Sequence, residues 1–140
     1  MEELTFEVFE PEIKYESEKY PLQEETGVIL GVCFEVSKHL RGGLSEAVYQ
    51  EALEYEFSKR KIPFERQKKY LVHYKDVVLK KSFVADFLVY DKIILEIKAQ
   101  NGIPEECYQQ VINYLAISKN KVGLIVNFYS SALKYKRVIL

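Results

Sequence analysis

Apolar residues recur at helical spacing in the first part of the chain. They fall three and four positions apart between residues 21 and 40, and again between residues 45 and 61, so the sequence predicts one helix over each range. Ser45 is the expected N-cap of the second helix. Gly42 and Gly43 are expected to end the first helix, because glycine readily adopts the left-handed conformation found at a helix end.

After residue 63 the pattern changes to alternating and short continuous apolar runs, which are typical of strands. One helical stretch interrupts them, with Pro104 at its expected first position and Glu105 and Glu106 in its first turn. A helix between two strands fits a crossover connection, so we expect an α/β domain with a mixed β-sheet flanked by helices. The expected elements are strands over 64–74, 77–89, 93–99, 122–128 and 133–139, and a helix from 103–104 to about 118.

The composition is that of an ordinary globular domain, with 140 residues, 48% of them apolar and 29% charged. These values exclude a wholly disordered chain and a disulfide scaffold, and no apolar run is long enough to cross a membrane. Cys33 and Cys107 lie in apolar stretches without a partner at metal-binding spacing, so we expect core residues and no zinc site. The acidic start, which lacks the basic region of a secretory signal, predicts a soluble cytoplasmic protein.

The net charge of −1 conceals two regions of opposite sign. Residues 1–25 carry nine acids and two bases, whereas residues 26–140 carry twelve acids and eighteen bases. We therefore divide the chain into an acidic N-terminal arm, residues 1–20, and a single domain, residues 21–140. A basic domain favours an anionic partner such as nucleic acid, although solvated surface lysines would give the same count. The acidic arm is either a solvated tail or a docking segment, which could fold back onto the basic face.

The most informative stretch is a hairpin over residues 83–98, with its turn at Asp91. Residues equally distant from Asp91 face each other across the ladder, so Asp86 is expected opposite Glu96. Lys98 lies on the same face as Glu96, because side chains alternate along a strand. The other face is entirely apolar and is expected to be core: Phe83, Ala85, Phe87, Val89, Ile93, Leu95 and Ile97.

Two carboxylates opposed across a ladder repel each other, so this arrangement needs compensation. Lys98 supplies part of it, and a divalent cation would supply more, because carboxylates are preferred ligands of Mg²⁺ and Mn²⁺. A lysine beside such an ion can orient a water and neutralise charge on a phosphoryl group. The alternative is a solvated strand face with one salt bridge. Leu88 and Ile94 share this face, which favours a partly covered site.

The pattern Asp86…Glu96-x-Lys98 on a hairpin, followed by a helix, resembles the PD-(D/E)xK nuclease superfamily. More narrowly, the segment Gly43-Leu-Ser-Glu46-Ala-Val-Tyr49 is similar to the signature of the small GxxExxY proteins within it. The resemblance covers residues 22–140. Further similar blocks are Glu51-Ala-Leu53, Phe64-Glu-Arg66-Gln67, Ala85-Asp86-Phe-Leu-Val, Glu96-Ile-Lys98-Ala, Gln110-Val-Ile-Asn113-Tyr114-Leu115 and Val122-Gly-Leu-Ile-Val-Asn127-Phe.

The resemblance implies a PD-(D/E)xK nuclease-like core of helix, three strands, helix and strand, with one extra N-terminal helix. It implies that a Mg²⁺ or Mn²⁺ ion is held by Asp86, Glu96 and the backbone carbonyl of Ile97. Lys98 would then lie near the attacking water. The proline in the superfamily's name is absent here, since Val84-Ala85 precede the aspartate.

Two polar residues outside the hairpin are also assigned by the resemblance. Glu46 is expected to touch the water shell of the metal, although an acid in the first turn of a helix is favourable by the helix dipole alone. Gln110, on the crossover helix, is expected near the site, although a packing hydrogen bond would equally explain an amide there. From the residues themselves, Arg66, Lys68 and Lys69 are candidates for phosphate contacts, with a solvated strand edge as the alternative.

These observations predict a metal-dependent nuclease that hydrolyses phosphodiester bonds in nucleic acid, in DNA rather than RNA. Two alternatives stay open, a catalytically inactive nuclease fold that binds nucleic acid and a subunit that binds a partner protein. No membrane association is expected, and a homodimer is compatible with the sequence without being indicated by it. Metal binding and cleavage distinguish the three interpretations.

Overall fold

The eight secondary-structure elements predicted from the sequence are all present in the described part of the chain. The computed structural model describes residues 21–140, and the acidic arm predicted at residues 1–20 lies outside the described residues. In chain order the elements are α1 (Gln23–Leu40), α2 (Glu46–Lys59), β1 (Phe64–Tyr74), β2 (Val77–Val89), β3 (Ile93–Lys98), α3 (Glu105–Ser118), β4 (Val122–Asn127) and β5 (Lys134–Ile139).

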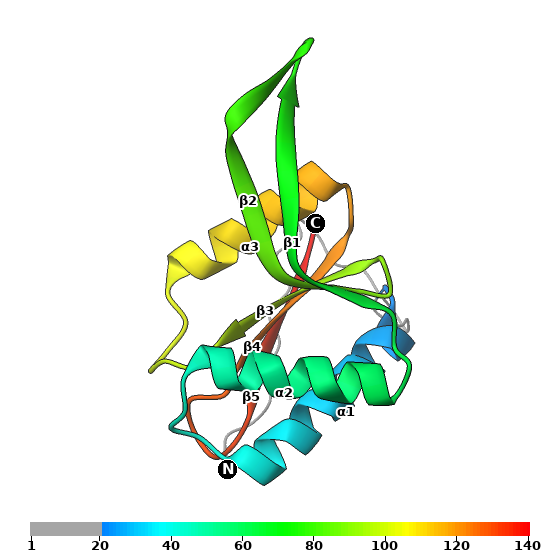
Figure 1. The fold of residues 1–140 in the computed structure, drawn as a ribbon. Coiled ribbons are helices and arrows are strands. Elements are labelled where there is room, and N and C mark those ends of the chain that lie inside the picture. Colours follow the sequence, from blue (N-terminus) through cyan, green and yellow to red (C-terminus); the bar gives the residue numbers. More distant parts are fainter. Residues whose placement is uncertain (1–20) are drawn as a thin grey trace, which may run out of the picture.

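The five strands form one sheet in the order β1-β2-β3-β4-β5. Helix α3 connects β3 to β4, which run parallel, and the other neighbouring strands are antiparallel. Helices α1 and α2 cover one face of the sheet and α3 covers the other (Figure 1). This arrangement confirms the predicted mixed α/β fold, including the crossover helix.

Helices on both faces divide the core into two layers. Val32 and Leu53 pack with Leu95 in the layer beneath α1 and α2, and Val111 packs with Ile94 in the layer beneath α3. Consecutive residues of β3 therefore pack into opposite core layers. Burial on both faces explains why β3 and β4 read as continuous apolar runs rather than as alternating ones.

The hairpin of β1 and β2 bends where the sequence predicted one continuous apolar face. Phe87 packs beneath α1 and α2 as expected, but Ala85 packs beneath α3. The change falls between the pairs Arg66↔Phe87 and Lys68↔Ala85, where Gln67 adopts a positive φ of 57°. A left-handed residue breaks the regular strand geometry, so the outer part of the hairpin turns away from the sheet (Figure 1). The prediction of a single core face is therefore wrong beyond this bend.

Two helix ends also differ from the predictions. The positive φ that ends α1 is at Arg41 (62°), and Gly43 follows with a φ of 98°, so the Gly42-Gly43 pair acts after the helix end rather than at it. Pro104 is the N-cap of α3 rather than its first residue. Ser45 is the N-cap of α2 as predicted, but its side chain makes no capping hydrogen bond.

Cys33 and Cys107 are buried, as predicted, and both are free thiols. Burial raises the pKa of both thiols, that of Cys107 to about 11. Neither thiol is therefore a ready nucleophile at neutral pH. Among the described helices, none combines the length and the apolar character needed to span a bilayer.

Gly123→Ala tests the close contact between β4 and α3. A Cβ atom at position 123 would lie 2.6 Å from Cγ1 of Val111, which is fully buried, so one of the two elements must move. We expect the free energy of unfolding to fall by about 1–3 kcal/mol in urea denaturation. Gly31→Ala is the control, because the added Cβ there meets nothing within 4 Å. Equal stabilities of Gly123→Ala and the wild type would contradict this packing.

Candidate functional site

The candidate site lies where β2 and β3 separate. Their ladder pairs Val89 with Ile93 and ends at Phe87 and Leu95, which confirms the predicted register about Asp91. The next residue of each strand, farther from the turn, is Asp86 on β2 and Glu96 on β3. These two residues are not paired through backbone hydrogen bonds. Their carboxylates bridge the gap between the strands instead.

Each carboxylate accepts a backbone hydrogen bond from the opposite strand. The N–H of Asp86 donates to Oε2 of Glu96 (2.8 Å), and the N–H of Ile97 donates to Oδ2 of Asp86 (2.8 Å). Side chains thus replace the ladder at this point, and they are held face to face as the sequence predicted. Each of these bonds uses one oxygen of its carboxylate, and Asp86 also accepts a hydrogen bond from the side chain of Gln50.

Burial and mutual repulsion dominate the electrostatics of this pair. Glu96 is only 3% exposed, and burial followed by the charge of Asp86 raises its pKa to about 8. Burial also raises the pKa of Asp86, although the hydrogen bond from Ile97 and the charge of Lys98 oppose the rise. The pair therefore stabilises any positive charge placed between its carboxylates.

The donor set fits a hard divalent cation better than zinc. The described residues contain no group of three His, Cys, Asp or Glu side chains able to hold a metal. Mg²⁺ commonly binds through one or two carboxylates and completes its shell with water and phosphate oxygens, so the pair Asp86 and Glu96 is sufficient. The N–H and C=O of a strand residue point to the same side, so the carbonyl of Ile97 also faces the gap between β2 and β3.

Helix α2 brings Glu46 close to the acid pair Asp86 and Glu96. Its charge raises the pKa of both Asp86 and Glu96, so the three acids lie within electrostatic reach of one another. Glu46 is the first residue of α2, and the turn before that helix fixes its position.

The turn before α2 explains the spacing of the motif Gly43…Glu46…Tyr49. Gly43 supplies a φ of 98°, which a side chain would strain. The hydroxyl of the fully buried Tyr49 accepts a hydrogen bond from the N–H of Leu44 (3.2 Å) and donates one to the carbonyl of Arg41. Tyr49 therefore locks the connection between α1 and α2 and, with it, the start of the helix that carries Glu46.

Sequence reasoning missed Gln50, which lies one turn after Glu46. Gln50 is buried, and a hydrogen bond from its side chain lowers the pKa of Asp86. Its Oε1 accepts hydrogen bonds from Arg66 (3.4 Å) and Gln67 (3.1 Å). The available signal was a polar residue four positions from Glu46, which places both on one face of α2.

Lys98 and Gln110 both line an open groove of about 400 Å³ between α3 and the base of the β1–β2 hairpin. The positive charge of Lys98 lowers the pKa of both Asp86 and Glu96. Gln110 is exposed at the groove and hydrogen-bonds to Tyr114, whose hydroxyl donates to the carbonyl of Val84 (2.8 Å). Of the residues of the motif, Lys98 lines the groove, whereas the two carboxylates do not; the other lining residues are Phe83, Pro104, Glu106, Cys107, Gln109 and Asn113.

The three residues predicted to contact phosphates lie along β1 in different surroundings. Arg66 is half-buried and forms an ion pair with Glu54 of α2 (2.8 Å). Lys68 is half-buried and pairs with Glu65 (3.2 Å), and Lys69 is exposed. Arg66 thus supports the position of α2, whereas the two lysines lie where β1 leaves the sheet.

Comparison with known proteins identifies the family. The family model of the PD-(D/E)XK nuclease superfamily matches residues 23–138, so the chain belongs to that superfamily. A solved structure described as "Crystal structure of SSO0001" has a TM-score of 0.54 with 19% sequence identity and covers 66% of this chain. The match spans 48% of that protein, about half its length, and it supports the fold alone. The comparison with curated proteins gave no match.

The raised pKa of Glu96 predicts that the metal-free protein loses stability as the pH rises. The ordinary pKa is 4.5 and the folded value is about 8, so the stabilisation is complete below pH 4.5 and is lost as the pH rises through about 8. In EDTA, we expect the free energy of unfolding to fall by at least about 1 kcal/mol over this window, equivalent to one pKa unit.

In Glu96→Gln, the free energy of unfolding should fall less over this pH window, because an amide cannot ionise. The exposed Glu51→Gln is the matched control and should follow the wild type. Chemical denaturation at a series of pH values measures the effect. Parallel pH profiles for Glu96→Gln and the wild type would show that Glu96 ionises normally in the folded protein.

Proposed function

We propose that this member of the PD-(D/E)XK nuclease superfamily hydrolyses phosphodiester bonds in DNA with the help of a Mg²⁺ or Mn²⁺ ion. The observation that carries the proposal is the pair Asp86 and Glu96, which replaces the ladder between β2 and β3 and has Lys98 beside it. A purely structural strand pair would gain stability from a continued ladder, whereas this one keeps two repelling acids, the buried Glu96 and the half-buried Asp86.

The ligands proposed for the ion are the carboxylates of Asp86 and Glu96 and the carbonyl of Ile97. When bound, such an ion lowers the pKa of a coordinated water and neutralises charge on the phosphoryl oxygens. Repulsion within the acid pair keeps the site selective for a cation. The hydrogen bond from Gln50 holds the Asp86 carboxylate in position.

Lys98 is proposed to act on the attacking water and on the phosphate. Its ammonium group lies close enough to the acid pair to lower the pKa of both acids, and it lines the groove by which a substrate would approach. There it can orient the water and stabilise the negative charge that builds up on the phosphate. Glu46 is proposed to hydrogen-bond to water in the same site, and Gln110 to contact the substrate strand in the groove.

Nucleic acid is proposed as the substrate because phosphodiesters match both the groove and the charge of the domain. The groove joins Lys98 to the base of the hairpin, where Lys68 and Lys69 follow β1 outward. Phosphate contacts of this kind position a nucleic-acid strand without reading its sequence.

Lys98→Ala tests the function directly. We expect a loss of about 10²–10⁴-fold in the rate of Mn²⁺-dependent DNA cleavage, with the fold and metal affinity retained, because the lysine acts on water and phosphate rather than on the ion. Lys121→Ala removes an exposed lysine directly before β4 and is the control. Cleavage is followed on radiolabelled DNA and RNA of the same sequence, with Mn²⁺, with Mg²⁺ and with EDTA.

Two results would reject the proposal. Equal cleavage rates for Lys98→Ala and the wild type would remove the lysine from the reaction. Binding of DNA without cleavage under any of the metal conditions would instead identify a nuclease fold used only for binding.

A further inference from the structure

The outer part of the β1–β2 hairpin, residues 68–85, is called the hairpin arm here. Its base packs against α3 through Phe83 and Ala85, and beyond that base it projects from the rest of the domain (Figure 1). It begins at the bend next to Asp86 and ends at the turn of Lys75 and Asp76. At about 3.3 Å per strand residue, it extends roughly 25 Å from the candidate site. The fold does not need such a projection, because most of the arm makes no contribution to either core layer.

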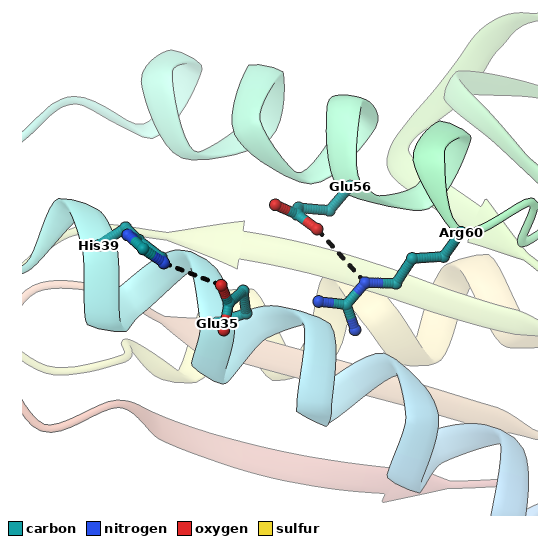
Figure 2. Close-up of polar contacts among 4 residues, drawn as sticks. All are labelled: Glu35, His39, Glu56 and Arg60. Atoms are coloured by element: carbon teal, nitrogen blue, oxygen red, sulfur yellow. Dashed lines mark hydrogen bonds and ion pairs between the residues drawn. The ribbon is translucent and has the colours of Figure 1, made fainter.

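The arm is strongly basic, in contrast to the α1–α2 face. Its only acid is Asp76, and its bases are Lys68, Lys69, Lys75, Lys80 and Lys81. On the α1–α2 face, His39 pairs with Glu35 (2.8 Å) and Arg60 with Glu56 (3.3 Å), as Figure 2 shows. The positive charge is therefore concentrated on the projection and not spread evenly over the domain.

Aromatic rings hold three of the arm lysines in place. Their ammonium groups lie over neighbouring rings at 5.3–5.7 Å: Lys68 over Tyr70, Lys75 over Tyr74 and Lys81 over Phe83. Cation–π contacts of this kind reduce the freedom of a flexible side chain. The arm thus presents partly ordered positive charges along its length.

Exposed apolar side chains alternate with these charges. Leu71, Tyr74, Val77 and Val78 are 46%, 56%, 50% and 51% exposed. An exposed apolar strip of this kind marks a binding surface. A second copy of the same arm would place like charges against each other, whereas a polyanion with apolar groups between its phosphates would satisfy both features of the surface.

We propose that the hairpin arm lies in the major groove of a B-form DNA duplex, so that double-stranded DNA is the substrate class of the candidate site. This inference rests on the proposed function, since it names the substrate of the same site. The major groove is about 12 Å wide and admits a two-stranded β-ribbon. The arm's length of roughly 25 Å corresponds to about three-quarters of one turn of the duplex, which is about 34 Å.

Both chemical features of the arm find partners in that groove. Lysine side chains reach the phosphates on either side, and the apolar side chains meet thymine methyl groups on the groove floor. The major groove of A-form RNA is too deep and narrow for such a ribbon, and a single strand has no groove. The base of the arm adjoins Asp86, so a DNA strand held along the arm would continue toward the candidate site.

The test compares two sets of three lysine substitutions. Lys75→Gln, Lys80→Gln and Lys81→Gln are combined in the arm variant. Lys38→Gln, Lys59→Gln and Lys121→Gln are combined in the control, which changes the net charge equally at exposed positions outside the arm. Fluorescence anisotropy in EDTA measures binding to a 24-base-pair DNA duplex, to one of its strands and to an RNA duplex of the same sequence.

We expect the wild type to bind the DNA duplex most tightly. The arm variant should lose at least tenfold in affinity for this duplex, while the control stays within about twofold of the wild type. The slope of log K against the logarithm of the salt concentration should become less negative by up to about 2.7 in the arm variant. This is about 0.9 for each of the three phosphates that a lysine no longer neutralises.

Three results would overturn the inference. Equal losses in the two variants would show a general charge effect. Equal binding of all three nucleic acids, with equal losses in the arm variant, would remove the groove as the binding site. A dimer seen by light scattering that dissociates in the arm variant, with DNA binding unchanged, would identify a second copy as the occupant.

The binding measurement separates this inference from the proposed function, because no hydrolysis takes place in EDTA. Arm-dependent duplex binding without cleavage in Mn²⁺ would reject the nuclease activity and leave the arm assignment standing. Cleavage of subsaturating duplex at equal rates by the wild type and the arm variant would reject the arm assignment and leave the activity standing.

Discussion

The repulsion between two carboxylates, the buried Glu96 and the half-buried Asp86, is the constraint on which the rest of this structure depends. Asp86 and Glu96 could have been placed apart, but the register about Asp91 brings them face to face. The domain tolerates them because each accepts a backbone N–H from the opposite strand. Those bonds replace the ladder, so the opening between β2 and β3 and the acid pair are one feature. What the bonds leave uncompensated is negative charge, which a cation is suited to neutralise.

The surroundings of the pair hold this opening in place from three directions. Tyr49 locks the turn before α2, so that Glu46 begins its helix beside the acids. Gln50 links Asp86 to β1 through Arg66 and Gln67. On the far side, α3 closes over the sheet at Gly123, and the groove beside it gives access to the lysine of the motif.

Local patterns were sufficient to predict the elements and the register, whereas features that depend on tertiary contacts were not. The facing of Asp86 and Glu96 followed from turn position and strand alternation alone. The bend at Gln67 did not, because a left-handed glutamine inside a strand has no signal in the pattern of apolar residues. The same bend separates Ala85 from the core that Phe87 joins. Gln50 was not predicted for a related reason: its role depends on hydrogen bonds to residues of β1 and β2, which the sequence pattern of α2 does not show.

Titration of the protein with Mn²⁺ by calorimetry tests the central claim, that Asp86 and Glu96 form one cation site. We expect one ion for each chain of the wild type, an affinity at least tenfold lower for Asp86→Asn and for Glu96→Gln, and an unchanged affinity for the exposed control Glu51→Gln. Lys98→Ala should bind the ion as well as the wild type or better, because removing a positive charge favours a cation. Undiminished Mn²⁺ affinity in Asp86→Asn would contradict a shared site.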